Sequence, residues 1–189
     1  MIEKASFQTH GYTLLRPFME GLDLAFLHNY ALHAARSRKL DADDAVPGTP
    51  AFYGDPVMET LLEKAAPRIE AETGLALYPT YSYFRVYKHG DQLRRHKDRP
   101  ACEISVTLSL GYDAEEPWPL WVDAGDGPLA APLEPGQALL YKGTQIWHWR
   151  EQFPGKHAAQ VFLHYVDRNG PFSDWKFDRR AALRLPPVR

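Results

Sequence analysis

The spacing of hydrophobic residues changes near residue 75 of the chain. Before this point, apolar residues recur at steps of three and four, which is the spacing of a helix that buries one face. After it, apolar and polar residues alternate, as they do in strands with one buried face. Because helices come first and strands follow, the order of elements predicts an α+β fold with helices on one face of a β core.

The first part of the chain predicts a short strand, a helix and a loop. Residues 7–18 mix apolar and polar positions and predict a strand that enters the domain. Residues 22–39 place their apolar side chains on one helical face. Residues 40–55 contain two prolines, two glycines and four aspartates, which predicts a loop. This loop is either an ordinary connection or a lid over a pocket.

A second helix is predicted after the loop. Asp55 suits the N-cap position, and Pro56 suits the first position of a helix. The pattern continues to Gly74, a residue that commonly ends a helix. Pro67 lies inside this segment, and we expect it to kink the helix or to split it in two.

The second part of the chain reads as a series of strands. Residues 80–88 alternate, with four large side chains on one face. Residues 103–110 alternate almost without a break, with small polar residues at odd positions and aliphatic ones at even positions. The polar face of this strand either meets water or lines a cavity while the aliphatic face packs on the helices. Further short strands are predicted at residues 118–122, 137–141, 146–150 and 158–166. Many short strands with frequent turns indicate a sandwich or barrel.

The length and composition fit one folded domain. A chain of 189 residues that is 44% hydrophobic can build a sizeable core. We expect residues 1–79 to be mainly helical support, residues 80–167 to form the β core, and residues 168–189 to be a C-terminal tail that wraps the surface.

Charge and cysteine content exclude several classes of protein. The formal net charge of −2 argues against binding to nucleic acid through bulk charge. No apolar run reaches membrane-spanning length, and the N-terminus does not resemble a signal peptide. Cys102 is the single cysteine, so no internal disulfide is possible and a reducing, cytoplasmic location is expected. We interpret Cys102 as a buried thiol rather than a ligand.

The residues with the clearest chemistry are His96, Asp98 and His148. On an extended chain His96 and Asp98 point to the same side, so they can bind one metal ion together. A His-x-Asp pair is a weak signal alone, but His148 on a later strand supplies a third ligand. Two histidines and one carboxylate form the facial arrangement that leaves coordination positions open, as in non-haem Fe(II) oxygenases. A structural zinc site usually needs four ligands rich in cysteine, which this chain lacks.

With these residues placed, roughly residues 80–167 resemble the Fe(II)/2-oxoglutarate-dependent dioxygenases, in particular the prolyl-4-hydroxylase-like branch. The segment FRVYKHGDQLRRHKD is similar to that branch's tyrosine-bearing strand, turn and His-x-Asp motif. The segment PGQALLYKGTQIWHWRE is similar to its turn, apolar strand and distal histidine. The resemblance implies a double-stranded β-helix (jelly-roll-like) core with the N-terminal helices packed on the larger sheet.

The resemblance also implies the cofactors and the reaction. His96, Asp98 and His148 would be the Fe(II) ligands, with 2-oxoglutarate as cosubstrate together with O₂. The implied reaction hydroxylates a C–H bond and releases succinate and CO₂. The substrate would be a small molecule, an amino acid or a peptide, and neither its identity nor the oligomeric state can be read from the residues.

The basic residue that anchors the cosubstrate carboxylate departs from the family pattern. Relatives carry an Arg or Lys on the last strand, and here that place falls at or just after Lys156, with no basic residue pointing inward. Arg150 is the best substitute, because it lies on the same side of its strand as His148 and its planar fork matches a carboxylate. Tyr87 and Arg85 share a face of the neighbouring strand and are candidate helpers. The alternative for both arginines is a surface salt bridge.

Two other features remain open. His164 is either a hydrogen-bonded core histidine or a contact beside the iron and its cosubstrate. The basic residues around the motif are Arg94, Arg95, Lys97 and Arg99. They either guide an acidic substrate or are solvated surface charges.

Two other classes of protein compete with the dioxygenase. The first is a cupin-like metal enzyme, such as an isomerase, that works without 2-oxoglutarate. The second is a non-catalytic β-sandwich binding module in which His96 and His148 are incidental.

Overall fold

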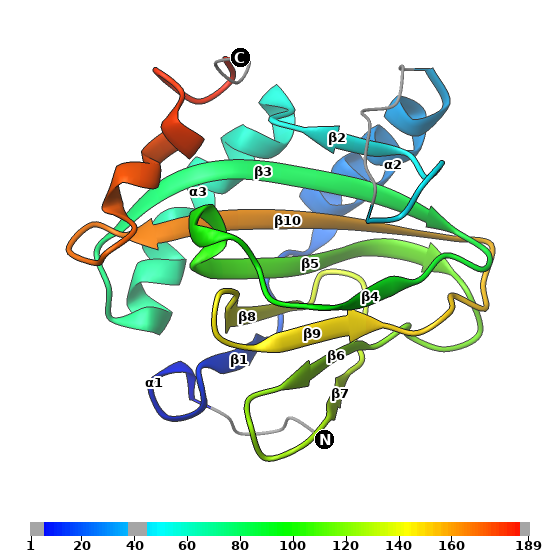
Figure 1. Cartoon of the computed structure of the whole chain (residues 1–189). Helices are drawn as coiled ribbons and strands as arrows, with labels where there is room; N and C mark the ends of the chain where they lie inside the picture. The colour runs from blue at the N-terminus through cyan, green and yellow to red at the C-terminus, as the bar shows by residue number, and fades with distance from the viewer. Residues whose placement is uncertain (1–5, 38–44, 186–189) are drawn as a thin grey trace.

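Two antiparallel β-sheets form the centre of the molecule, and helices cover the outer face of the larger one (Figure 1). The computed structural model describes residues 6–37 and 45–185. The larger sheet has the order β1 (Tyr12–Leu15), β8 (Ala138–Lys142), β5 (Ile104–Asp113), β10 (His157–Asp167), β3 (Leu77–Lys88) and β2 (Ala51–Tyr53). The smaller sheet has the order β4 (Leu93–His96), β9 (Trp147–Arg150), β6 (Leu120–Asp123) and β7 (Leu129–Ala131). The predicted α+β, jelly-roll-like architecture is confirmed.

The two long helices are α2 (Gly21–Ser37) and α3 (Pro56–Thr73), which pack on strands β3, β5 and β10. As predicted, Asp55 caps α3 by accepting hydrogen bonds from the backbone N–H groups of Val57 and Met58, at 3.0 and 3.3 Å. Gly74 ends the helix in a left-handed conformation, with φ of 70°.

The expectation that Pro67 splits α3 is wrong, because the helix continues through it. Leu62 and Ile69 lie on either side of Pro67, and both are fully buried in the same core. Their packing on the sheet offsets the backbone hydrogen bond that proline cannot donate.

The strand β5 explains the alternating pattern of the sequence. Its even residues, such as Val106 and Leu108, belong to the core between the sheet and the helices. Its odd residues Ser105, Thr107 and Ser109 are also buried, but on the face that looks toward the smaller sheet. Of the two interpretations of this strand, the cavity-lining one therefore holds.

Two predicted boundaries at the N-terminal end are wrong. Residues 7–10 form a single turn of helix (α1, Phe7–His10) instead of a strand, because Ser6 caps its start and Gly11 ends it with φ of 76°. The strand begins only at Tyr12. Within the predicted loop 40–55, Ala51–Tyr53 forms β2 at the edge of the larger sheet, while the stretch 38–44 lies outside the described residues.

Three short elements were not predicted. They are β7, the 3₁₀ turn η1 (Pro100–Cys102) and the irregular helical segment η2 (Ser173–Arg179). The segment η2 belongs to the C-terminal tail and packs against β3 and β10. Among the described residues, no helix is long and apolar enough to cross a membrane.

Candidate metal centre and cavity

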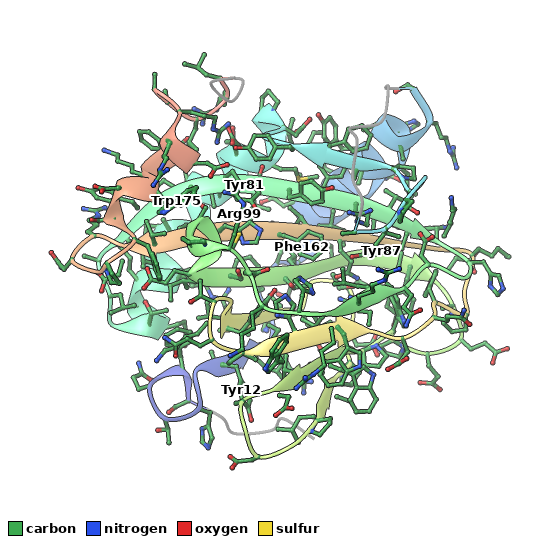
Figure 2. The ribbon with its side chains drawn as sticks, in the orientation of Figure 1. Tyr12, Tyr81, Tyr87, Arg99, Phe162 and Trp175 are labelled. Atoms are coloured by element: carbon green, nitrogen blue, oxygen red, sulfur yellow. The ribbon has the colours of Figure 1, made fainter. Side chains whose placement is uncertain are left out.

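A cavity of about 380 Å³ opens between the two sheets, next to the predicted metal ligands. Its walls carry many aromatic side chains together with two arginines. The lining residues used below are Tyr53, Tyr81, Tyr83, Arg85, Tyr87, Arg99, Thr107, Tyr141, Phe162 and His164, besides the three ligands. Figure 2 shows that Tyr81, Tyr87 and Phe162 lie along the same face of the larger sheet.

The pairing of β4 with β9 brings the three predicted ligands together. His96 lies directly opposite His148 in the strand register, and Asp98 follows β4 by two residues. The Nε2 atoms of His96 and His148 lie 3.6 and 3.4 Å from Asp98 Oδ1. All three ligand atoms lie within 4.8 Å of one another.

The second nitrogen of each imidazole is already engaged. His96 Nδ1 lies 2.8 Å from the Arg94 carbonyl oxygen, and His148 Nδ1 lies 3.1 Å from the Ile146 carbonyl oxygen. Because a carbonyl only accepts, each Nδ1 donates its hydrogen and each Nε2 faces Asp98. A protonated Nε2 donates to that carboxylate, whereas a deprotonated Nε2 offers its lone pair to a metal. Metal-binding histidines are typically oriented in this way, so the residues present fit a divalent metal.

The charge of the group also suits a cation. Burial raises the pKa of Asp98, but hydrogen bonds from His148 and His96 outweigh it and hold that pKa well below its usual range. Burial lowers the pKa of His96, but the hydrogen bond to Asp98 outweighs it and leaves the pKa raised. Asp98 is therefore an anion at neutral pH.

Two neighbours fix the position of Asp98. Ser105 Oγ donates to Asp98 Oδ2 at 2.9 Å, and the Asp98 backbone N–H donates to the Gly143 carbonyl at 2.9 Å. A Cβ atom at Gly143 would lie 2.3 Å from Asp98 Oδ2 and from the Cys102 carbonyl oxygen. No residue larger than glycine fits there unless Asp98 or the backbone moves.

Arg150 has an unusual environment. It is fully buried, and its Nη1 and Nη2 donate to the Trp118 carbonyl at 2.6 Å and to Gln160 Oε1 at 3.3 Å. Its Nε has no hydrogen-bond partner, and within the described part of the chain no carboxylate lies within 4.0 Å of it. Burial lowers the pKa of Arg150, and the phenols of Tyr87 and Tyr141 oppose that shift.

The environment of Arg150 has a clear consequence. A buried cation without a counter-charge is costly, so the site favours an anion. Arg150 lies two residues beyond His148 on β9, a separation of roughly 6.6 Å along a strand. The surface salt bridge considered for Arg150 is wrong, because none of its side chain reaches solvent.

The other predicted cosubstrate residues divide into two groups. Arg85 and Tyr87 line the cavity; Arg85 donates to the Tyr83 hydroxyl at 3.1 Å and lies near the Tyr87 ring. Lys156 is not part of the site: it precedes β10, and its exposed amine pairs with Asp113 at 3.1 Å. The prediction that included Lys156 is therefore wrong, because that residue lies in the turn and not on the inward face of the strand.

His164 lies on the cavity wall and is buried. Its Nδ1 lies 3.0 Å from Ser105 Oγ, which in turn contacts Asp98. Burial lowers the pKa of His164 to about 4, so its ring is neutral at neutral pH. His164 is therefore a hydrogen-bonded core residue that also lines the cavity, and its contact with the iron or the cosubstrate stays a prediction.

Cys102 is a buried thiol, as predicted. Its sulfur lies 3.1 Å from the Tyr81 hydroxyl, and burial raises its pKa far above the usual value. Asp98, Cys102 and His164 are close enough to form a second group of candidate ligands. A protonated thiol is a poor metal ligand, however, and Asp98 already belongs to the first group.

Sequence reasoning missed three residues of the site. Ser105 was visible only as one small polar position in the alternating strand, and nothing marked Gly143 as the neighbour of Asp98. The contact of Gln160 with Arg150 joins two separate strands, so no local signal pointed to it.

Comparisons with known proteins give a consistent result at the level of the fold. No protein-family description matches the sequence, and no curated protein matches it. Several solved structures do. A Pseudomonas putida prolyl-4-hydroxylase is 18% identical with a TM-score of 0.69, over 86% of this chain and 96% of that one. EctD from S. alaskensis, solved with 2-oxoglutarate and 5-hydroxyectoine, is 19% identical with a TM-score of 0.71, over 96% and 85%.

A third structure, the non-haem α-ketoglutarate-dependent epimerase SnoN from nogalamycin biosynthesis, is 12% identical with a TM-score of 0.74, over 97% of this chain and 90% of that one. The chain therefore has the fold of the 2-oxoglutarate- and Fe(II)-dependent oxygenases. Prolyl-4-hydroxylase structures are among its structural relatives, as the sequence resemblance implied.

Proposed function

We propose that the protein is an Fe(II)- and 2-oxoglutarate-dependent dioxygenase that hydroxylates a C–H bond of a small molecule, an amino acid or a peptide. The observation that carries this proposal is the buried guanidinium of Arg150, which has no counter-charge among the described residues and lies two residues beyond His148 on β9, the strand that contributes to the His96, Asp98 and His148 group. EctD, a protein of the same fold, has been solved both with bound Fe and with 2-oxoglutarate.

Three side chains would bind the metal. His96, Asp98 and His148 would hold the metal through two Nε2 atoms and one carboxylate oxygen. When bound there, Fe(II) supplies the open coordination positions at which 2-oxoglutarate and O₂ react to give succinate and CO₂. Because each Nδ1 is fixed by a backbone carbonyl, the ligands are oriented before the metal arrives.

Arg150 would bind the distal carboxylate of 2-oxoglutarate. The Nε–H group of Arg150 can donate to one more acceptor, and the phenol of Tyr87 lies near the Arg150 guanidinium. Arg85 lines the cavity and would add positive potential there. The aromatic walls would exclude water from the reaction.

The location of the protein follows from its single thiol. Cys102 is buried and cannot form an internal disulfide. We therefore propose a reducing compartment such as the cytoplasm.

Anaerobic absorption spectroscopy tests the reaction class. Metal-free protein titrated with Fe(II) and then with 2-oxoglutarate should develop a weak visible charge-transfer band. His148→Ala should abolish the band. A protein that binds Fe(II) but shows no band at saturating 2-oxoglutarate would point to the cupin-like alternative, and one that binds no metal would point to a binding module.

A variant of Arg150 tests the anchor within the same experiment. Arg150→Gln should weaken 2-oxoglutarate binding by about ten- to a hundredfold, because it removes hydrogen bonds from a charged donor. Lys156→Gln is the matched control and should leave the affinity unchanged, since its amine pairs with Asp113 outside the cavity. An unchanged affinity in Arg150→Gln would reject the anchor while leaving the metal ligands in place.

A further inference from the structure

Arg99 lines the same cavity as the metal ligands and directly follows one of them, Asp98. Its side chain is 43% exposed. The guanidinium lies 4.7 Å from the centre of the Tyr81 ring and 5.7 Å from that of Trp175. Figure 2 shows Arg99 beside Tyr81 and Trp175 and away from Tyr87. A substrate in this cavity would have Arg99 as part of its surroundings.

The Arg99 fork already holds a carboxylate. Nη1 and Nη2 donate to Asp178 Oδ1 and Oδ2 at 2.7 and 2.8 Å. The Tyr53 hydroxyl also donates to Asp178 Oδ2, at 2.5 Å. This is the two-pronged geometry in which arginine recognises carboxylates. The remaining N–H groups of Arg99 have no acceptor among residues 6–37 and 45–185.

The segment that carries Asp178 has a strained backbone. Phe177, Asp178 and Arg179 have φ values of 54°, 56° and 60°, and none of them is glycine. Left-handed conformations are unfavourable for such residues, and runs of them persist only where surrounding contacts hold them. The contact of Asp178 with Arg99 and Tyr53 is one of these contacts.

A separate contact fixes the same segment to the body of the protein. Arg180 Nη2 lies 2.5 Å from Glu59 Oε1 on α3, and both side chains are almost fully buried. Arg180 also donates to the Thr80 carbonyl at 3.0 Å. Asp178 can therefore leave Arg99 while the chain stays anchored two residues further on.

We propose that Arg99 binds a carboxylate of the substrate, and that Asp178 occupies this position until the substrate displaces it. The proposal rests on the proposed function, because it places the substrate in the same cavity. The substrate class is an organic acid with an apolar body, since the ring of Tyr81 lies against Arg99 and the rings of Tyr83 and Phe162 line the same cavity. Displacement would relieve the strained backbone of residues 177–179.

Binding to metal-free protein tests the proposal. The probes are phenylacetate and its uncharged match phenylacetamide, titrated by calorimetry. Asp178→Asn removes the resident charge and should bind phenylacetate about tenfold more tightly than the wild type, because the subsite is then vacant more often. Phenylacetamide should bind all variants equally. Arg99→Gln should lose the preference for the acid over the amide.

The controls use a second exposed arginine–aspartate pair. Arg95 donates to Asp123 at 2.8 Å, its side chain is 48% exposed, and neither residue lines the cavity. Arg95→Gln and Asp123→Asn should behave as the wild type. If Asp178→Asn does not fold, Tyr53→Phe takes its place, since it removes one of the hydrogen bonds that hold Asp178. A gain of about fivefold is then expected.

The outcomes separate this proposal from the proposed function. Binding that is unchanged by both Asp178→Asn and Arg99→Gln would overturn the subsite, and so would an equal gain in affinity for acid and amide. Acid binding that is lost only in Arg150→Gln would place the probe at the cosubstrate position, and would also overturn the subsite. Since the titration uses neither iron nor 2-oxoglutarate, the charge-transfer band can fail or succeed independently of it.

Discussion

Single residues around Asp98 explain why the metal group is preorganised. Ser105 holds the oxygen of Asp98 that does not face the histidines, and Gly143 leaves the space that this carboxylate occupies. His164 contacts Ser105 from the opposite side. The site therefore depends on residues whose side chains are small or absent, as well as on its three ligands.

Ser105→Ala should weaken metal binding. The substitution removes the hydrogen bond to Asp98 Oδ2, and the loss of a partner that orients a ligand typically costs about ten- to a hundredfold in metal affinity. Ser109→Ala is the matched control, because Ser109 is equally buried on the same face of β5 but contacts Gln160 instead. Titration with Co(II), followed by absorption, measures both. Equal affinities in the two variants would contradict the orienting role.

Gly143→Ala should destabilise the protein by roughly 1–3 kcal/mol, because the added carbon would overlap Asp98 and a backbone carbonyl. Denaturant unfolding of the metal-free protein measures this change. Gly170→Ala is the control: its added carbon would come no closer than 3.0 Å to the Asp167 side chain and 3.5 Å to the Asp167 carbonyl oxygen. If Gly143→Ala lowers the free energy of unfolding no more than Gly170→Ala does, Asp98 can move aside without cost.

His164 should make stability depend on pH. Burial lowers its pKa from 6.5 to about 4, so the unfolded chain takes up a proton that the folded chain refuses. The free energy of unfolding therefore keeps its full value above pH 6.5, as far as His164 is concerned, and it decreases as the pH falls toward 4. Between pH 7 and pH 5 the loss is about 2 kcal/mol. The free energy of unfolding of metal-free wild type should fall by this much more than that of His164→Gln; parallel pH profiles would reject the assignment.

At the scale of elements, α3 connects the core to the C-terminal segment. Its Glu59 is fully buried and receives the Arg180 guanidinium. The local sequence gave no indication of this pair, since a glutamate in the first turn of a helix is normally a surface residue. By contrast, the N-cap, the start and the end of α3 were all predictable, because they depend on neighbouring residues only.

Arg180→Met should cost about 3–5 kcal/mol, because it leaves the Glu59 carboxylate buried without a counter-charge. Lys64→Met, on the same helix, is the control. Lys64 lies 3.8 Å from Asp23 in a pair whose side chains are 76% and 73% exposed, and such pairs contribute about 1 kcal/mol at most. Thermal and denaturant unfolding measure the stability of both variants. If Arg180→Met and Lys64→Met lose similar amounts of stability, water reaches Glu59.

At the scale of the whole molecule, the fold class and the grouping of His96, Asp98 and His148 could be predicted, but several contacts between distant parts could not. The ligands were found because the His-x-Asp spacing and the alternating β5 are local signals. The Asp178–Arg99 contact joins residues 79 positions apart and depends on where the tail packs. The same holds for β10, which lies between β3 and β5. Periodicity indicates that strands exist, whereas their order depends on packing that no single segment contains.

The position of β4 gives its charged residues a further meaning. It is the outer strand of the smaller sheet, with β9 on one side and no strand of the described chain on the other. A free strand edge invites pairing with another molecule, and lysine and arginine side chains are a common protection against it. Arg94 and Arg95 on β4 and Lys97 just after it supply that protection beside the metal ligands. We therefore expect the charges around the motif to keep separate copies of the protein from aggregating through the strand that carries His96.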